Sequence, residues 1–329
     1  QENYGFDRQA WFEPVGEECH ALRSNVGIID ISNFGKYEIK GVGAGDWLNE
    51  IVANKVPYEI GHSCLTPLLG IRGGIAGDFT ITMLGNDHYW MIGSGMAERY
   101  HQRYFASVKR AETVSFQSRT NAFCGFNVAG PRSRELLSRL SQANFSKDSW
   151  KFMHSRKITV AGIEAIAIRV SFTGDLGWEI YVPEFDQLKL YEALLNTGFD
   201  LGVRPVGGRA LGSLRIEKGY GSWGREYSPE YWPQEVGLSK LIKMEKPNFL
   251  GREAYAALIN EAPREQLVIL EVDVKNADAS GGEPVFLCDG TPVGRVSSGA
   301  YGYTVKKSLA LCFIKSEYVG VGNQFDIAI

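Results

Sequence analysis

The chain has 329 residues, of which 44% are hydrophobic and 22% are charged, and its formal net charge is -3. These values are typical of an ordinary soluble globular protein with room for two or three domains. No long Lys/Arg run indicates nucleic acid or an anionic membrane as a partner, and no apolar run approaches the roughly 18 residues that a membrane-spanning helix needs.

The five cysteines are far apart and form no C-x-x-C pair, so neither a disulfide framework nor a zinc site is indicated. The five histidines show no metal-ligand spacing either, and we expect no metal. Reduced thiols fit a cytoplasmic or mitochondrial-matrix protein. The chain begins at Gln1 rather than Met and ends inside a strand-like run, so we expect it to be part of a longer polypeptide.

Alternation and helical spacing predict the first elements in chain order. A strand is expected at 35–40, a helix at 46–52 and a β-hairpin from the strands 78–84 and 88–92 around a Gly-Asn-Asp turn. A helix follows at 95–108 and a strand at 114–118.

The next part of the chain mixes strands and helices without the regular alternation of a parallel barrel. Its expected elements are strands near 123–129, 155–160, 163–171 and 178–182, and helices near 131–141 and 185–196. This order predicts an α+β fold with mainly antiparallel sheets.

The pattern changes after residue 264, where short strands alternate with Gly, Asp and Pro turns. The expected strands are 266–273, 284–287, 291–297, 308–314 and 324–329. This spacing predicts a small β-barrel or sandwich. We therefore divide the chain into regions 1–264 and 265–329, and expect the second region to be truncated at its end.

Two glycine-rich segments are expected to form turns of different kinds. A dinucleotide fingerprint would need a third glycine where Asp46 stands, so residues 41–45 are expected to be a plain strand-to-helix turn with no flavin or nucleotide site. Residues 73–77 instead lead into an apolar strand with Asp78 at the junction. An acid there is usually a turn cap, but it could also serve chemistry.

Two other features admit a structural or a functional interpretation. Glu179 lies in an otherwise apolar strand, where it could form an ion pair or accept two N–H groups from a planar heterocycle. The loop that follows Gly219 is rich in Gly, Pro and aromatic residues, among them Trp223. Its rings either pin the loop or line a pocket for a flat ligand.

Several motifs, taken in order along nearly the whole chain, resemble the glycine cleavage T-protein family. They are GGIAGD at 73–78, VAGPR at 128–132, FTGDLGWEI at 172–180, SLRIEKGY at 213–220 and VSSGAY at 296–301. One branch is still more similar, the C-terminal half of dimethylglycine and sarcosine dehydrogenases. The segments that carry this similarity are WFEPVGEE at 11–18, ISNFGK at 31–36, LTPLL at 65–69 and EKGYGSWGRE at 217–226.

The resemblance implies a three-part cloverleaf fold that ends in a small β-barrel, and it assigns roles to single residues. Asp78 matches the essential aspartate of the family, and Glu179 matches its pterin-binding glutamate. Phe172 stands where the family has a tyrosine near the pterin, and Leu65 and Trp90 match further folate contacts. Trp223 is added as a ring that could flank the pterin.

The chain departs from the family pattern at one place. The family also has an Arg-Asp pair before its Ser-Leu-Arg, but here Leu211 and Gly212 stand there, and Arg209 is the nearest arginine.

In that branch an N-terminal half carries FAD and oxidises an N-methyl amine, and the C-terminal half binds tetrahydrofolate and captures the one-carbon unit as 5,10-methylenetetrahydrofolate. The resemblance therefore implies a folate, an N-methylated amine and an FAD-binding domain, in cis or in trans, as partners. In this chemistry Asp78 would stabilise cationic nitrogen and accept a proton, while Glu179 would orient the pterin.

Three alternatives remain open. One is a stand-alone folate-dependent aminomethyltransferase or demethylase. Another is a non-catalytic folate-binding protein that aids iron–sulfur assembly, although that branch has a Lys-Gly-Cys-Tyr motif whose cysteine is lacking at Lys218-Gly219-Tyr220. The third is a domain that has lost its ligand, which the retention of Asp78 and Glu179 argues against.

Overall fold

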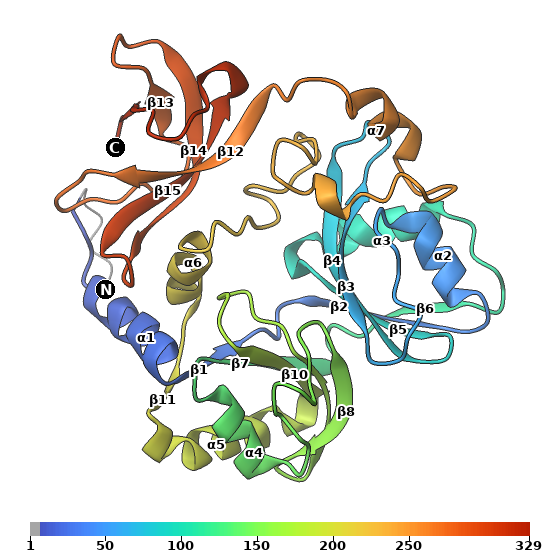
Figure 1. The fold of residues 1–329 in the computed structure, drawn as a ribbon. Helices are drawn as coiled ribbons and strands as arrows, with labels where there is room; N and C mark the ends of the chain where they lie inside the picture. The colour runs from blue at the N-terminus through green and yellow to red at the C-terminus, as the bar shows by residue number, and fades with distance from the viewer. Residues whose placement is uncertain (1–6) are drawn as a thin grey trace.

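The computed structural model describes residues 7–329 and arranges three β-sheets as three lobes (Figure 1). All strand pairs in these sheets are antiparallel except the short pairing of β1 with β11. The expected α+β class with mainly antiparallel sheets is confirmed. No helix in residues 7–329 is long and apolar enough to cross a membrane.

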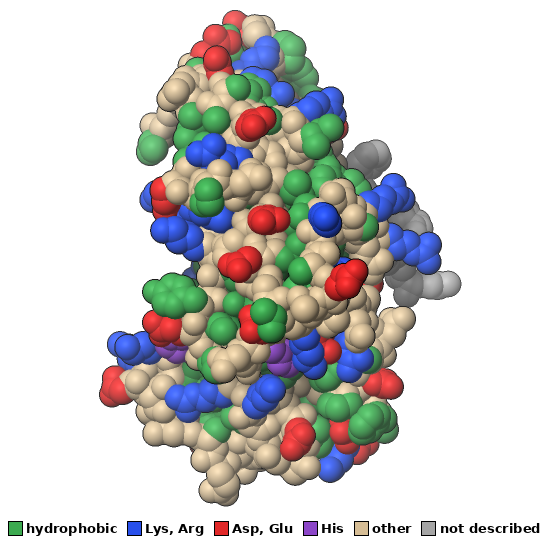
Figure 2. All heavy atoms as spheres, turned by 90° about the vertical axis from the view of Figure 1, so that its right-hand side faces the viewer, with side chains coloured by type: hydrophobic (Ala, Val, Ile, Leu, Met, Phe, Trp, Pro, Cys, Tyr) green, Lys and Arg blue, Asp and Glu red, His purple; other side chains and the backbone are tan. Residues whose placement is uncertain are grey.

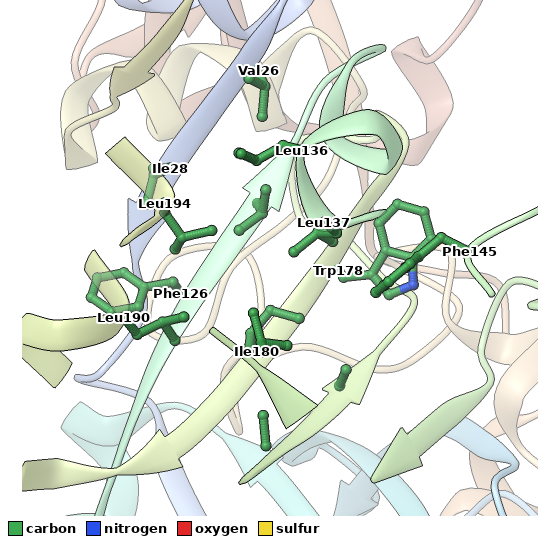
Figure 3. Close-up of a cluster of buried hydrophobic side chains, with 14 of the residues drawn as sticks. Val26, Ile28, Phe126, Leu136, Leu137, Phe145, Trp178, Ile180, Leu190 and Leu194 are labelled. Carbon is green, nitrogen blue, oxygen red and sulfur yellow. The ribbon is translucent and has the colours of Figure 1, made fainter. Parts of the chain in front are cut away.

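The first lobe is a six-stranded sheet with strand order β11-β1-β7-β10-β9-β8. Its strands are β1 (Val26–Asp30), β7 (Phe123–Ala129), β8 (Ser155–Val160), β9 (Ile163–Ile168), β10 (Gly177–Pro183) and β11 (Val203–Pro205). Helices α4 (Ser133–Leu140) and α5 (Gln187–Thr197) pack on one face. Figure 3 shows Leu136 and Leu137 pointing into this core with Trp178.

The second lobe is a five-stranded sheet with strand order β3-β4-β5-β2-β6. Its strands are β2 (Gly35–Lys40), β3 (Ser63–Leu69), β4 (Ile75–Gly85), β5 (His88–Gly93) and β6 (Ser115–Ser118). Helices α2 (Ala44–Ile51) and α3 (Glu98–Ser107) supply side chains to the core on one of its faces.

Figure 2 shows acidic and basic side chains interspersed on one face of the molecule, without a continuous basic stripe.

The third lobe is the C-terminal sheet, whose strand order is β12-β15-β14-β13-β16. Its strands are β12 (Glu265–Val272), β13 (Pro284–Phe286), β14 (Pro292–Gly302), β15 (Lys307–Lys315) and β16 (Asp326–Ile327). Helix α7 (Arg252–Leu258) precedes it along the chain. We keep the division between residues 264 and 265 as a proposal; the new sheet begins at Glu265.

The lobes meet through a shared apolar core that includes side chains from α1 (Phe12–Ser24) and α6 (Gly208–Ile216). Trp90 and Ile92 come to this core from the second lobe, and Ile168 and Tyr181 come from the first. In each of these two sheets, the helices of its own lobe cover one face. The opposite faces of the two sheets pack toward each other. This junction is where the candidate site lies.

Most expected elements are present, and the differences have local causes. Helix α2 begins at Ala44 rather than 46 because Gly43, with φ of 89°, turns the chain directly into the helix. Strand β9 ends at Ile168 rather than 171: Arg169 still exchanges backbone hydrogen bonds with His154 and Met153, but the Val170 N–H turns back to the Ile168 carbonyl. At the C-terminus only Asp326–Ile327 pair as a strand.

Candidate active site

Asp78 lies on β4 and shares a sheet face with Leu65 and Trp90. Leu65 pairs with Thr80, which is two residues from Asp78, and Trp90 pairs with Thr82. Side chains of directly paired residues, and of residues two apart on one strand, lie on the same face. The neighbouring Phe79 points the other way, into the core of the second lobe.

The carboxyl group of Asp78 is held away from water without a full set of partners. The residue is partly buried, but its Oδ1 atom is inaccessible to solvent and has no hydrogen-bond partner among the described residues. Burial raises the pKa of Asp78 to about 6. A buried acceptor without a donor is costly, and such groups are concentrated where a ligand or a reaction needs them.

Glu179 lies on β10 of the first lobe and is 6% exposed. Its Oε2 accepts a hydrogen bond of 2.7 Å from the Tyr181 hydroxyl, and no cation pairs with it among residues 7–329. Burial raises the pKa of Glu179 to about 7, although the hydrogen bond from Tyr181 opposes the shift. The ion-pair interpretation of Glu179 is therefore wrong, because a second donor to this carboxyl group would have to come from a ligand or from solvent.

Trp90 and Tyr181 connect the two sheets at this point. Their ring centroids are 6.2 Å apart in an edge-on arrangement, and Trp90 also contacts Phe123 at 5.1 Å. Trp90 is 1% exposed, yet its Nε1 has no hydrogen-bond partner in the described part of the chain. The sheets thus bring the Trp90 ring against Tyr181, whose hydroxyl donates to Glu179.

Phe172 lies in the loop between β9 and β10 and stacks on Tyr220, with ring centroids 6.1 Å apart and an interplanar angle of 24°. Asn127, which pairs with Glu179 across the sheet, holds the start of this loop: it donates to the Val170 carbonyl at 3.2 Å and accepts from Ser171 at 3.0 Å. Phe172 is therefore fixed relative to the strand that carries Glu179.

Arg23 of α1 holds the other end of the same loop. Its guanidinium donates to the Thr173 carbonyl at 3.0 Å, pairs with Asp175, and pairs with Glu217 at 2.9 Å. Because Glu217 follows α6, the ion pairs join α1, the loop that carries Phe172 and the end of α6. A partly buried network of this kind restricts the loop more than a single surface pair could.

The remaining sequence candidates lie elsewhere or at the margin. Leu65 is 45% exposed at the rim of the Asp78 face. Trp223 packs on His101 at 5.2 Å, and His101 contacts Phe79, so Trp223 lies with the core side of β4 rather than with Asp78. The guanidinium of Arg209 lies over the Trp11 ring at 4.5 Å.

Sequence reasoning missed Tyr181, Asn127 and Tyr227 as site residues. Tyr181 was open to prediction, because strand alternation places it on the same face as Glu179 two residues away. Asn127 requires knowledge of the β7–β10 register. Tyr227 belongs to a long loop that brings it near Asp78. Burial raises the pKa of Tyr227 to about 12, and the charge of Asp78 adds to the shift.

The geometry suits a polar planar ligand and proton transfer near neutral pH. Two acids with raised pKa values can each change protonation at physiological pH. Glu179 accepts a hydrogen bond from Tyr181, which packs on Trp90. Asp78 has a carboxyl oxygen without a donor among the described residues. A ligand that brings N–H groups to the carboxylates would satisfy what the protein leaves unpaired.

Two family descriptions match the chain. "GCVT N-terminal domain" matches residues 1–246, and "Glycine cleavage T-protein C-terminal barrel domain" matches residues 265–329. The fold is that of the glycine cleavage system aminomethyltransferase T from Bartonella henselae, with a TM-score of 0.86 at 22% identity over 96% of this chain and 85% of that chain. The expected cloverleaf fold is confirmed.

Among curated proteins, mitochondrial dimethylglycine dehydrogenase of Mus musculus is 33% identical over 98% of this chain and 37% of its own length. The formaldehyde-forming 4-methylaminobutanoate oxidase of Paenarthrobacter nicotinovorans is 33% identical over 96% of this chain and 38% of its own. The aminomethyltransferase of Thermoanaerobacter sp. (strain X514) is 27% identical over 97% of this chain and 86% of its own. This chain thus spans little more than a third of the length of the first two relatives.

Proposed function

Because the chain belongs to the glycine cleavage T-protein family, we propose that it binds tetrahydrofolate and passes to it a one-carbon unit from an oxidised N-methyl amine of the dimethylglycine or sarcosine type. The observation that carries the proposal is the pair of buried, underpartnered carboxyl groups, Asp78 and Glu179, on two sheets that pack together. Relatives that are dehydrogenases or oxidases of methylated amines support the amine class.

Glu179 is the group that orients the folate. A carboxylate can accept two N–H bonds from one edge of a planar heterocycle, and the hydrogen bond from Tyr181 leaves acceptor capacity on Glu179. Phe172 and Tyr220 offer ring surfaces near the same strand, and the buried Trp90, which packs on Tyr181, has an indole N–H without a partner among the described residues. These residues fit a flat, polar ligand such as the folate.

Asp78 is the catalytic carboxylate. Bound tetrahydrofolate would supply the nucleophilic nitrogens that accept the one-carbon unit. Asp78 holds negative charge close to the point where positive charge develops on nitrogen, and its pKa of about 6 lets it accept a proton and release it again near neutral pH. Its partly buried position limits the access of water, which would otherwise hydrolyse an iminium to formaldehyde.

An FAD-binding domain, in the same polypeptide or in a separate one, is the proposed source of the oxidised amine. The basis is that this chain spans only 37% of the mouse dehydrogenase and 38% of the bacterial oxidase that it resembles. For the location we propose the mitochondrial matrix or the cytoplasm, and the mitochondrial mouse relative supports the first of these.

A partition assay tests the proposal. The chain is added to a flavin-dependent dimethylglycine dehydrogenase truncated before its own C-terminal region, with dimethylglycine, tetrahydrofolate and an artificial electron acceptor. We expect the chain to shift the product from formaldehyde to 5,10-methylenetetrahydrofolate. Asp78→Asn should keep its folate affinity but lose at least about 100-fold in transfer, because the amide can neither carry the charge nor accept the proton. Equal loss of affinity and transfer would remove Asp78 from the catalytic role.

A stand-alone aminomethyltransferase is the second candidate, favoured by the match over 86% of the Thermoanaerobacter protein. In that case the chain would release methylenetetrahydrofolate from an aminomethyl donor without any flavoprotein. Transfer that occurs only with the flavoprotein would reject this candidate.

A further inference from the structure

Apart from Asp78 and Glu179, Glu226 is a buried carboxylate that has donors on both of its oxygens. Glu226 is 0% exposed. Its Oε2 accepts hydrogen bonds from the Arg215 guanidinium at 3.0 Å and from the backbone N–H of Ser222 at 2.9 Å. Its Oε1 accepts from the hydroxyls of Ser297 at 2.7 Å and Ser298 at 2.5 Å.

These donors come from three separate parts of the chain. Arg215 belongs to α6, Ser222 to the loop that follows it, and both serines to β14 of the C-terminal lobe. Arg215 also donates to the Tyr220 carbonyl at 2.8 Å and to Ser298 at 2.7 Å. The carboxylate thus ties the loop to the C-terminal sheet.

A β-bulge makes the arrangement possible. Consecutive side chains of a regular strand point to opposite faces, so two adjacent serines could not both reach one oxygen. The register of β14 against β15 shifts between Val296 and Ser298, which leaves Ser297 as an extra residue. Bulges re-aim side chains and are common next to active sites. Here the bulge directs both hydroxyls to Glu226.

The loop held in this way carries residues that face the proposed site. Tyr220 stacks on Phe172, and Tyr227, next to Glu226, lies near Asp78. Tyr227 packs so closely on Gly221 that a Cβ atom there would be 2.7 Å from its ring. The position of both tyrosines therefore depends on how the loop is anchored.

We propose that Glu226, fixed by the bulged Ser297–Ser298 pair, is a positioning residue through which the C-terminal lobe sets the aromatic wall of the folate site. The inference rests on the proposed function, because it names the part of the molecule that shapes that site. The C-terminal lobe then has a role in binding even though Asp78 and Glu179 both lie outside it.

The test compares Ser298→Ala and the Ser297→Ala/Ser298→Ala double variant with Ser308→Ala, all in the complete chain. Ser308 is a matched control, because it is also a buried serine of the C-terminal sheet but its hydroxyl has no hydrogen-bond partner among the described residues. Two measurements are made on each: hydrogen exchange of the amides of 220–227 and of β15, and the dissociation constant of tetrahydrofolate under anaerobic conditions.

We expect Ser298→Ala to weaken folate binding about tenfold and to speed exchange in 220–227 while β15 stays protected, and the double variant to do more; Ser308→Ala should change neither. Ser298→Thr, which retains the hydroxyl, should restore part of the affinity. Faster loop exchange with unchanged affinity would overturn the positioning role. Loss of protection throughout β15 would also overturn it, since the serines would then be merely structural. Absence of binding by the wild-type chain would instead remove the proposed function, and this inference with it.

Discussion

Two regions of the molecule bury carboxylates in opposite ways. At the junction of the first two lobes, Asp78 and Glu179 are surrounded by aromatic and aliphatic groups and have few donors. Beside the C-terminal lobe, Glu226 and Glu235 are 0% and 1% exposed, and each is paired with an arginine and accepts at least one backbone N–H. Glu179 is buried much like Glu226 and Glu235, and Asp78 is partly buried, but the two regions differ sharply in the hydrogen-bond and charge partners they give their acids.

The difference shows in protonation. Burial raises the pKa values of Asp78 and Glu179 because the charged form loses water and gains little in return. Burial opposes ionisation at Glu226 as well, but Arg215 and the hydroxyls of Ser298 and Ser297 more than compensate, so the pKa of Glu226 lies below its usual value. Burial alone therefore does not mark a functional acid; burial without partners does.

The same substitution in the two regions should have opposite effects on stability. Glu226→Gln leaves the buried Arg215 without a counter-charge, and we expect a loss of about 3 to 5 kcal/mol in the free energy of unfolding. Glu179→Gln removes an unpaired charge and should cost little or stabilise the chain at pH 8. Urea denaturation measures both. Equal destabilisation by the two changes would break the comparison.

The pH dependence of stability sharpens the same contrast. The folded pKa of Glu179, about 7, lies above its ordinary value of 4.5, so its stabilising contribution is present at low pH and is lost as the pH rises through 7. Relative to Glu179→Gln, the wild type should lose roughly 3 kcal/mol between pH 4.5 and pH 8. Glu226, whose pKa is lowered, should show the opposite trend: its contribution is lost as the pH falls. A flat difference between wild type and Glu179→Gln would contradict the raised pKa.

Tyr181→Phe should have a smaller effect. It removes the single donor that residues 7–329 provide to Glu179, and it should raise the pKa of that carboxyl group further, because the hydrogen bond favours the ionised form. We expect about 1 kcal/mol less free energy of unfolding at pH 8 and a few-fold weaker folate binding. Tyr191→Phe, in the same lobe but stacked on Phe126, is the control and should leave folate affinity unchanged.

The smallest effect is expected from the surface. Lys307 and Glu271 pair across exposed strand positions, with side chains 52% and 59% exposed. Glu271→Gln should change the free energy of unfolding by no more than about 0.5 kcal/mol and leave folate binding intact. A loss in the free energy of unfolding as large as that of Glu226→Gln would contradict the comparison. It would mean that an ion pair stabilises the chain equally whether it is exposed or buried.

Much of this arrangement could be predicted from sequence because it is local. Alternation along 178–182 shows that Glu179 projects opposite its apolar neighbours, and the glycine-rich turn before Asp78 predicts the start of a strand. The small C-terminal sheet is visible in the spacing of its strands and turns. Helix α1 is not among the predicted elements; it contains Gly16, where a Cβ atom would lie 2.7 Å from the ring of Tyr303.

What could not be predicted depends on contacts between distant segments. Trp90 meets Tyr181 only through the packing of two sheets, and Glu226 meets Ser298 only because β14 contains a bulge. Trp223 was expected beside the folate because aromatic loops often line pockets, but the loop turns its ring toward His101. Strand registers and loop paths of this kind are set by tertiary packing, which no local pattern records.

The most direct test of the central claim is a calorimetric titration of the chain with tetrahydrofolate under anaerobic conditions, with Glu179→Ala and the exposed strand variant Glu164→Ala in parallel. We predict saturable binding at one site, weakened at least about 50-fold by Glu179→Ala and unchanged by Glu164→Ala. Absence of binding by the folded wild-type chain, or equal affinity in Glu179→Ala, would contradict the assignment of the junction between the lobes as a folate site.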